Sequence, residues 1–85
     1  MKEFTYTITD TLGIHARPGG ELVKVAKTYA SKITLSCNGK SVDAKRLFSV
    51  MSLGAKQNHQ VCVKIEGDDE EAAAEALEKF FNDNL

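Results

Sequence analysis

Residues that build disulfide frameworks, metal clusters and rigid turns are scarce in this sequence, which has two cysteines and one proline in 85 residues. Cys37 and Cys62 are too few and too far apart to predict a disulfide framework or a zinc site. We therefore expect reduced thiols that serve packing, with no bound metal and no cofactor.

An excess of charge of one sign is also absent, because the formal net charge is only −1. Proteins that bind nucleic acid through its phosphates carry a basic surface, so nucleic-acid binding is not expected. Long apolar runs are missing as well, and residues 1–9 alternate polar and apolar side chains instead of forming the apolar segment of a signal peptide. These features predict a cytoplasmic protein that does not insert into a membrane.

What is present is the composition of an ordinary globular protein, with 42% hydrophobic and 27% charged residues. A chain of this length is expected to form one domain over residues 1–85, with one small core. The sequence contains no linker, internal repeat or low-complexity segment.

Three segments have the alternation of a strand with one buried face. Residues 4–8 and 33–37 alternate apolar with polar side chains, and residues 61–65 do so until Gly67. Asn38-Gly39 is a strong hairpin signal, because both residues tolerate positive φ. We therefore expect a short partner strand over residues 40–43.

Three segments are expected to be helical. Residues 16–30 place their apolar side chains at intervals of three, four and seven. Residues 45–54 form a compact apolar run that ends in glycine, which favours two helical turns, although periodicity alone also permits a buried strand. The last helix follows Asp68-Asp69-Glu70-Glu71, an acidic start with capping-box spacing. Its apolar stripe is expected to comprise Ala73, Leu77, Phe80, Phe81 and Asn84.

The expected order is β-α-β-β-α-β-α, which predicts an α+β open-faced sandwich with a four-stranded antiparallel sheet covered on one face by three helices. The pattern alone does not give the strand order. A ferredoxin-like arrangement fits the first six elements equally well.

The segment Gly13-Ile14-His15-Ala16-Arg17-Pro18-Gly19-Gly20 stands where strand pattern gives way to helix. Pro18 suits the first helical turn, where its missing N–H costs nothing, and it disfavours regular helical dihedrals at Arg17. The N–H groups of Ala16 and Arg17 are then free to bind an anion, and phosphate suits this geometry. The guanidinium of Arg17 adds a forked donor for the same oxygens.

The positive end of the helix and Arg17 both favour the neutral form of His15, and a neutral ring nitrogen is a nucleophile. We infer that His15 takes a phosphoryl group, which the helix start and Arg17 then hold. The alternative is a histidine that only caps the turn. Gly19 and Gly20 allow two interpretations: they permit close approach by a partner, or they make the helix start flexible. His59 is expected to be a solvated loop residue.

Taken together, these residues resemble the HPr family, the histidine-containing phosphocarriers of the bacterial phosphoenolpyruvate–sugar phosphotransferase system. The resemblance covers essentially the whole chain. It rests on the segment from Gly13 to Pro18, on Asn38-Gly39-Lys40, on Lys45 to Gly54, and on Glu66-Gly67 before the acidic helix start.

This resemblance implies that His15 accepts a phosphoryl group at Nδ1 from enzyme I and passes it to an enzyme IIA. It implies a carrier with a phosphohistidine intermediate, rather than an enzyme, and we expect a monomer. Arg17 corresponds to the family's phosphate-contacting arginine. The expected docking residues are Gly20, Lys24, Lys45, Arg46, Leu47, Phe48 and Met51, with Val50 and Leu53 turned inward.

Two positions depart from the family pattern. Arg46 occupies the position of the regulatory serine of Gram-positive members, so we do not expect control by a kinase at that position. We expect Lys45 and Arg46 to form a positive rim beside His15 that aids encounter with an acidic partner. Gly19-Gly20-Glu21 stands where the family has small or apolar residues, and Glu21 places an acid on the docking face, which would alter partner preference.

Three alternatives stay open. A regulatory relative would signal by its phosphorylation state without feeding sugar uptake. A nitrogen-type phosphotransferase branch would use the same fold. A ferredoxin-like enzyme such as an acylphosphatase would need an arginine-bearing phosphate loop with an asparagine nearby, and the sequence offers no such loop.

Overall fold

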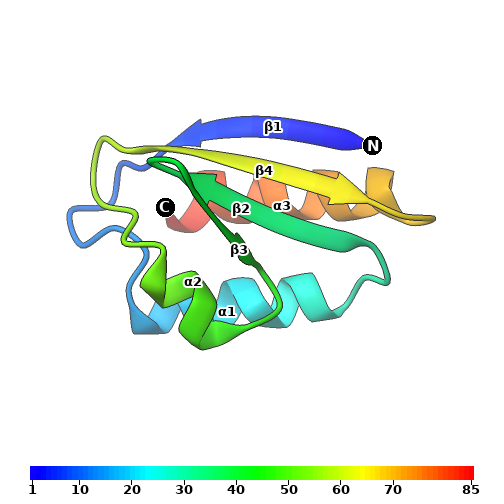
Figure 1. The fold of residues 1–85 in the computed structure, drawn as a ribbon, viewed down its shortest axis with the longest axis horizontal. Helices are drawn as coiled ribbons and strands as arrows, with labels where there is room; N and C mark the ends of the chain where they lie inside the picture. Colours follow the sequence, from blue (N-terminus) through cyan, green and yellow to red (C-terminus); the bar gives the residue numbers. More distant parts are fainter.

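The computed structural model describes residues 1–85 as a four-stranded sheet with three helices packed beneath it (Figure 1). The strands are β1 (Lys2–Thr7), β2 (Lys32–Cys37), β3 (Lys40–Asp43) and β4 (Gln60–Glu66). The helices are α1 (Ala16–Lys27), α2 (Leu47–Ser52) and α3 (Glu70–Asn84). The predicted element order and the open-faced architecture are confirmed.

Hydrogen bonds set the strand order β1-β4-β2-β3, which the sequence pattern left open. All three pairings are antiparallel, and Val63 of the central strand β4 lies opposite Phe4 on one side and Leu35 on the other. The turn between β2 and β3 has positive φ at Asn38 (52°) and Gly39 (80°), as the hairpin signal predicted.

The core lies between the sheet and the helices. Alternate residues of β2 and β4, among them Ile33, Leu35, Val61 and Val63, point toward the helices and are fully buried. Phe81 of α3 packs edge-on against the half-buried rings of β1, which closes that end of the core. Burial is therefore one-sided along each strand, which is what the alternating pattern predicted.

The two cysteines are free thiols on opposite faces of the sheet. Cys37 is 3% exposed and joins the core, and burial raises the pKa of its thiol. Cys62 is half-buried, and burial together with the charge of Glu3 raises the pKa of its thiol. The expectation of reduced, packed cysteines fits Cys37 better than Cys62.

Helices α1 and α2 are shorter than predicted. Helix α1 ends at Lys27, not Ala30, because the N–H of Ala30 donates to the carboxylate of Asp69 (2.8 Å) and the chain turns toward β2. Helix α2 starts at Leu47, because Asp43 binds the N–H groups of the two residues before it and holds them in a turn. Its end matches the prediction, with φ of +70° at Gly54.

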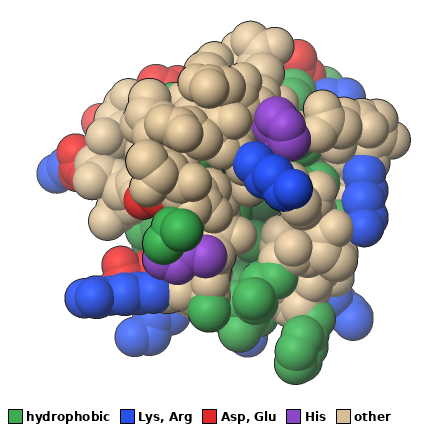
Figure 2. Space-filling view, turned by 90° about the vertical axis from the view of Figure 1, so that its left-hand side faces the viewer, with side chains coloured by type: hydrophobic (Ala, Val, Ile, Leu, Met, Phe, Trp, Pro, Cys, Tyr) green, Lys and Arg blue, Asp and Glu red, His purple; other side chains and the backbone are tan.

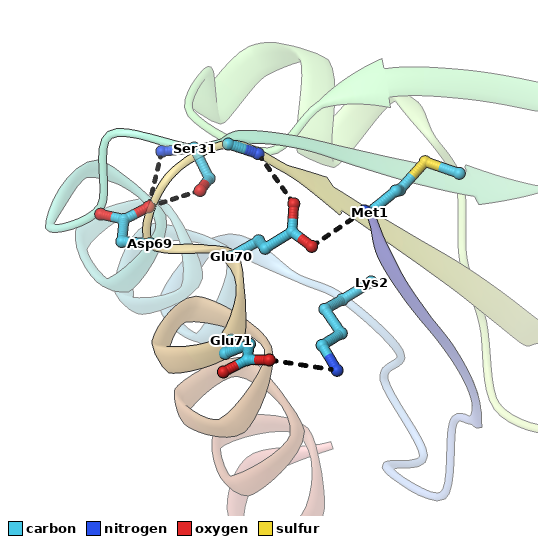
Figure 3. Close-up of polar contacts among 7 residues, drawn as sticks. Met1, Lys2, Ser31, Asp69, Glu70 and Glu71 are labelled. Carbon is cyan, nitrogen blue, oxygen red and sulfur yellow. Dashed lines mark hydrogen bonds and ion pairs between the residues drawn. The ribbon is translucent and has the colours of Figure 1, made fainter.

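The acidic start of α3 does not form the predicted capping box. Asp69 is the N-cap residue, but its carboxylate makes no cap bond and instead accepts hydrogen bonds from the N–H and the hydroxyl of Ser31 (Figure 3). It also accepts the N–H of Ala30. Glu70 accepts the N–H of Gly67 at 3.2 Å. Asp69 therefore ties α3 to the segment that joins α1 to β2, and the hydrogen bond from Ser31 is the main reason that the pKa of its carboxyl lies below the ordinary value.

No helix in the structure is both long enough and apolar enough to cross a membrane.

Candidate functional site

His15 is the N-cap residue of α1. Its backbone is extended (φ −103°, ψ −175°), and its carbonyl oxygen accepts the hydrogen bond that starts the helix from the N–H of Gly19 at 2.8 Å. The imidazole makes no cap bond to the backbone and is half-exposed. The main chain of His15 therefore begins the helix, while its ring nitrogens remain available to a second molecule.

The first turn of α1 has backbone donors without partners. The N–H groups of Ala16 and Arg17 make no hydrogen bond within the protein, and Pro18 has no N–H to donate. Pro18 is buried, which anchors this turn to the body of the molecule. Two free donors at the positive end of a helix, beside a histidine ring, are an arrangement that suits an anion, and the sequence predicted that these two N–H groups would be free.

Arg17 lies beside this place with its side chain free. It is exposed and forms no ion pair and no hydrogen bond in the protein. With His15 and Pro18 it lines an open hollow of about 230 Å³ whose other walls are Asp10, Glu21 and Asn84. No apolar side chain lines the hollow apart from the proline ring, so a small charged group fits it better than an apolar ligand.

Two carboxylates face the same hollow as the cation. Asp10 accepts the N–H of Leu12 at 2.8 Å through Oδ1, which folds the loop before His15. Glu21 stands one turn after Arg17 on α1, yet neither acid forms an ion pair with the guanidinium. The guanidinium is thus available to an incoming anion, and the two acids place negative charge in the walls of the same hollow.

The loop that presents His15 rests against the segment after α2. The N–H of Ile14 donates to the carbonyl of Ala55 at 3.0 Å. Gly13 has φ of +66°, and a Cβ built on it would lie 2.3 Å from the oxygen of Ala55. Only glycine permits this close approach, which fixes the position of the residue next to the histidine.

An exposed apolar patch lies beside the histidine loop. Phe48 is 87% exposed, Leu47 38% and Met51 41%, and Figure 2 shows hydrophobic side chains gathered on the face that carries histidine. A Cβ built on Gly19 would lie 3.6 Å from Leu47 Cδ1 and 3.9 Å from Met51 Cγ, so the patch adjoins the first turn of α1. Val50 and Leu53 are buried, as predicted.

The cations around the patch do not all stand where the sequence suggested. Lys24 is exposed on α1, and Arg46 is 77% exposed with its Nε 3.9 Å from Asp43 Oδ2. Lys45 donates from Nζ to the carbonyl of Tyr29 at 2.8 Å, beyond the end of α1 opposite to His15. The expected rim of two free cations beside His15 is therefore wrong for Lys45, because the carbonyl at the helix end holds its ammonium group.

Gly20 is half-buried, and a Cβ built on it would have no atom within 4 Å. Space above this residue is therefore open, which permits close approach by another molecule.

Three residues near the site differ from the sequence interpretation. Asn84, expected on the apolar stripe of α3, is exposed and lines the hollow, and Leu85 is buried instead. Asp10 was missed, although Asp-Thr-Leu-Gly is a turn signal immediately before the histidine motif. His59 lies in a loop, as expected, but it is half-buried instead of fully solvated, and its Nδ1 accepts the N–H of Lys56 at 3.1 Å.

No three histidine, cysteine or acidic side chains stand together in a way that could hold a metal ion.

Comparisons with known proteins agree with one another. The family model described as "PTS HPr component phosphorylation site" matches residues 2–83. The phosphocarrier protein HPr of Xylella fastidiosa (strain Temecula1) is 40% identical over 85 residues, which cover 100% of this chain and 96% of the relative. The HPr structure from Thermoanaerobacter tengcongensis superposes with a TM-score of 0.92 at 40% identity, covering 96% of this chain and 92% of that one. A dimer of HPr from the same organism superposes with a TM-score of 0.78, covering 98% and 95%.

Proposed function

Because the chain belongs to the HPr family of phosphocarriers of the phosphotransferase system, we propose that His15 accepts a phosphoryl group from phospho-enzyme I and passes it to an enzyme IIA. The observation that carries this proposal is the position of His15 as N-cap residue, next to the free N–H groups of Ala16 and Arg17. A ring nitrogen there can form a bond to phosphorus while donors for the phosphoryl oxygens are already in place.

In the proposed transfer, the lone pair of Nδ1 of neutral His15 forms the new P–N bond. The P–N bond of the donor phosphohistidine breaks at the same phosphorus, and its electron pair returns to the donor imidazole. The N–H groups of Ala16 and Arg17 and the guanidinium of Arg17 then share the charge of the bound phosphoryl oxygens. The onward step repeats this exchange with the acceptor histidine.

The acids in the hollow limit how tightly the phosphoryl group is held. Asp10 and Glu21 face the same hollow as His15, and like charges at short range disfavour a bound dianion. A carrier must release its group to the next protein, so moderate stabilisation suits this role better than the strongest possible binding.

The docking surface in this proposal comprises Gly20, Lys24, Arg46 and the apolar patch Leu47, Phe48 and Met51. Exposed apolar side chains of this size on a short helix are a mark of a protein–protein interface. Arg46 supplies a positive edge for an acidic partner, whereas Lys45 is engaged with Tyr29. Arg46 also has no hydroxyl, so the proposal includes no serine phosphorylation at this position.

The proposed carrier acts as a cytoplasmic monomer. His15, its two free N–H donors and Arg17 all belong to one chain, so a second copy is not needed to complete the site.

The experiment that tests the proposal is phosphorylation by phosphoenolpyruvate and a catalytic amount of enzyme I. We expect an acid-labile, base-stable adduct that is absent in His15→Ala and present in His59→Asn, which removes the only other histidine. An adduct in His15→Ala would overturn the proposal. An adduct that forms but passes to no enzyme IIA would favour the regulatory alternative.

A further inference from the structure

The second histidine has one backbone and two side-chain polar groups close to its Nδ1 atom. His59 Nδ1 accepts the N–H of Lys56 at 3.1 Å and lies 3.3 Å from Asn38 Nδ2 and 4.0 Å from Cys37 Sγ. A backbone N–H can only donate, so Nδ1 must carry a lone pair and the ring proton must sit on Nε2. The structure thus assigns one tautomer to this ring.

This imidazole ties two loops together. Lys56 and His59 begin and end a tight turn, closed by the N–H of His59 on the carbonyl of Lys56 at 3.0 Å. Asn38 belongs to the hairpin between β2 and β3, and its Nδ2 lies 3.3 Å from the same Nδ1 atom. The ring therefore satisfies the N–H of Lys56, which has no other partner in the protein, and links the turn to the hairpin.

The same turn supports the chain that leads to His15. Asn58 donates its N–H to Ile8 at 2.8 Å, and Ile8 donates its own to the carbonyl of His59 at 2.9 Å. Next to Lys56, the carbonyl of Ala55 accepts the N–H of Ile14 at 3.0 Å, one residue before the active histidine. Residues 55–59 therefore form the support on which both ends of the segment 8–14 rest.

We propose that His59 is a positioning residue for His15: its neutral ring holds residues 55–59 in place and, through the carbonyl of Ala55, fixes the segment that presents the phosphoryl acceptor. The ring of His59 takes no part in the chemistry. The link to transfer rate rests on the proposed function, whereas the link to the loop is a property of the folded chain alone.

The test compares His59→Asn with His59→Phe. Asparagine places an oxygen close to the position of Nδ1 and keeps an acceptor for Lys56, while phenylalanine keeps a ring of similar shape without an acceptor.

The first readout is the ¹⁵N spectrum of His59 in the unaltered protein, in which we expect the Nε2–H tautomer. A ring protonated on Nδ1 at neutral pH would overturn the proposal.

The second readout is amide hydrogen exchange at Ile14, with Val63 of the central strand as an internal reference for global unfolding. In His59→Phe we expect exchange at Ile14 to quicken by about tenfold more than at Val63, the effect of losing one hydrogen bond that supports the loop. In His59→Asn we expect the two amides to keep their original ratio. Equal acceleration at both amides, or no rescue by asparagine, would overturn the proposal.

The third readout is the rate at which phospho-enzyme I phosphorylates His15. We expect kcat to fall about three- to tenfold in His59→Phe with KM unchanged, and to recover in His59→Asn. An unchanged kcat in His59→Phe would refute the link to transfer. If the unaltered protein is not phosphorylated at all, the proposed function fails. The tautomer of His59 and the hydrogen exchange at Ile14 still decide whether His59 positions the loop.

Discussion

The carbonyl oxygen of His15 accepts the N–H of Gly19 at 2.8 Å, so the residue that begins α1 with its main chain keeps its side chain outside the helix. Hydrogen bonding within the helix starts at Gly19, and the N–H groups of Ala16 and Arg17 are left without a protein partner. This one relationship places the imidazole ring and two unpaired N–H groups side by side.

Arg17 is expected to affect transfer and not folding. In Arg17→Ala, we expect kcat/KM with phospho-enzyme I to fall about ten- to a hundredfold, because a charge-assisted donor to the phosphoryl oxygens is lost. The urea midpoint should not change, since Arg17 has no ion pair or hydrogen bond in the protein. Arg17→Lys should recover part of the rate, because it restores the charge but not the fork. A lower urea midpoint in Arg17→Ala would show that the residue supports the fold instead.

Gly20 separates the two interpretations of the glycine pair. Gly19→Ala and Gly20→Ala should each raise the free energy of unfolding by about 0.5–1 kcal/mol, because alanine favours the helix. Gly20 faces open space, so its new methyl group should obstruct a docked partner and slow transfer several-fold. At Gly19 the methyl group would meet Leu47 and Met51 at ordinary contact distance, and transfer should be unchanged. Full transfer by Gly20→Ala would mean that the pair serves only as a flexible helix start.

Phe48 tests the apolar patch, with Val50 of the same helix as the control. Phe48→Ala should leave the free energy of unfolding within about 0.5 kcal/mol, because the ring is 87% exposed. Its KM for enzyme I should rise about tenfold, as expected for loss of an aromatic contact in an interface. Val50→Ala should cost about 2 kcal/mol of stability, because the side chain is fully buried, and should leave KM unchanged. A KM that stays the same in Phe48→Ala would remove this ring from the docking surface.

Asp69 is expected to make stability depend on pH. The hydrogen bond from Ser31 and that from the N–H of Ala30 lower the pKa of its carboxyl in the folded state. The stabilisation is therefore complete above the ordinary carboxyl value of about 3.9 and is lost as the pH falls through the lower folded value. Asp69→Asn should be less stable than the unaltered protein at pH 7, and this difference should shrink below about pH 4.

Urea unfolding at several pH values measures this difference. Asp68→Asn is the matched control, because Asp68 is exposed and makes no hydrogen bond, and it should follow the unaltered protein throughout. A stability gap for Asp69→Asn that stays constant from pH 7 to pH 3 would contradict the account of this carboxylate.

Patterns between near neighbours in sequence predicted most of the fold. Val61 and Val63 are buried because alternate residues of a strand face the same side, and this can be read from the sequence without its partners. The turn at Asn38-Gly39 was likewise predicted from two adjacent residues. The location of His15 at a helix start followed from the change from strand to helical pattern and from Pro18, which marks the first turn.

Contacts between distant segments could not be read in this way. An acid at the start of a helix has the same local pattern whether it caps that helix or, like Asp69, binds Ser31 in another loop. His59 has no local motif, and its role depends on Lys56 and on Asn38, which arrives from a separate hairpin. The prediction that the ammonium group of Lys45 is free beside His15 was wrong for the same reason. That group binds the carbonyl of Tyr29, which lies near the end of α1 and is distant in sequence.

The most direct test of the central claim is the ¹H–¹⁵N spectrum of the protein before and after phosphorylation by phosphoenolpyruvate and enzyme I. The account predicts a phosphorus coupling to Nδ1 of His15 and marked downfield shifts of the amide protons of Ala16 and Arg17, which gain phosphoryl oxygens as acceptors. A phosphorylated His15 with both amide protons unshifted would contradict it, because the helix start would then hold none of the charge.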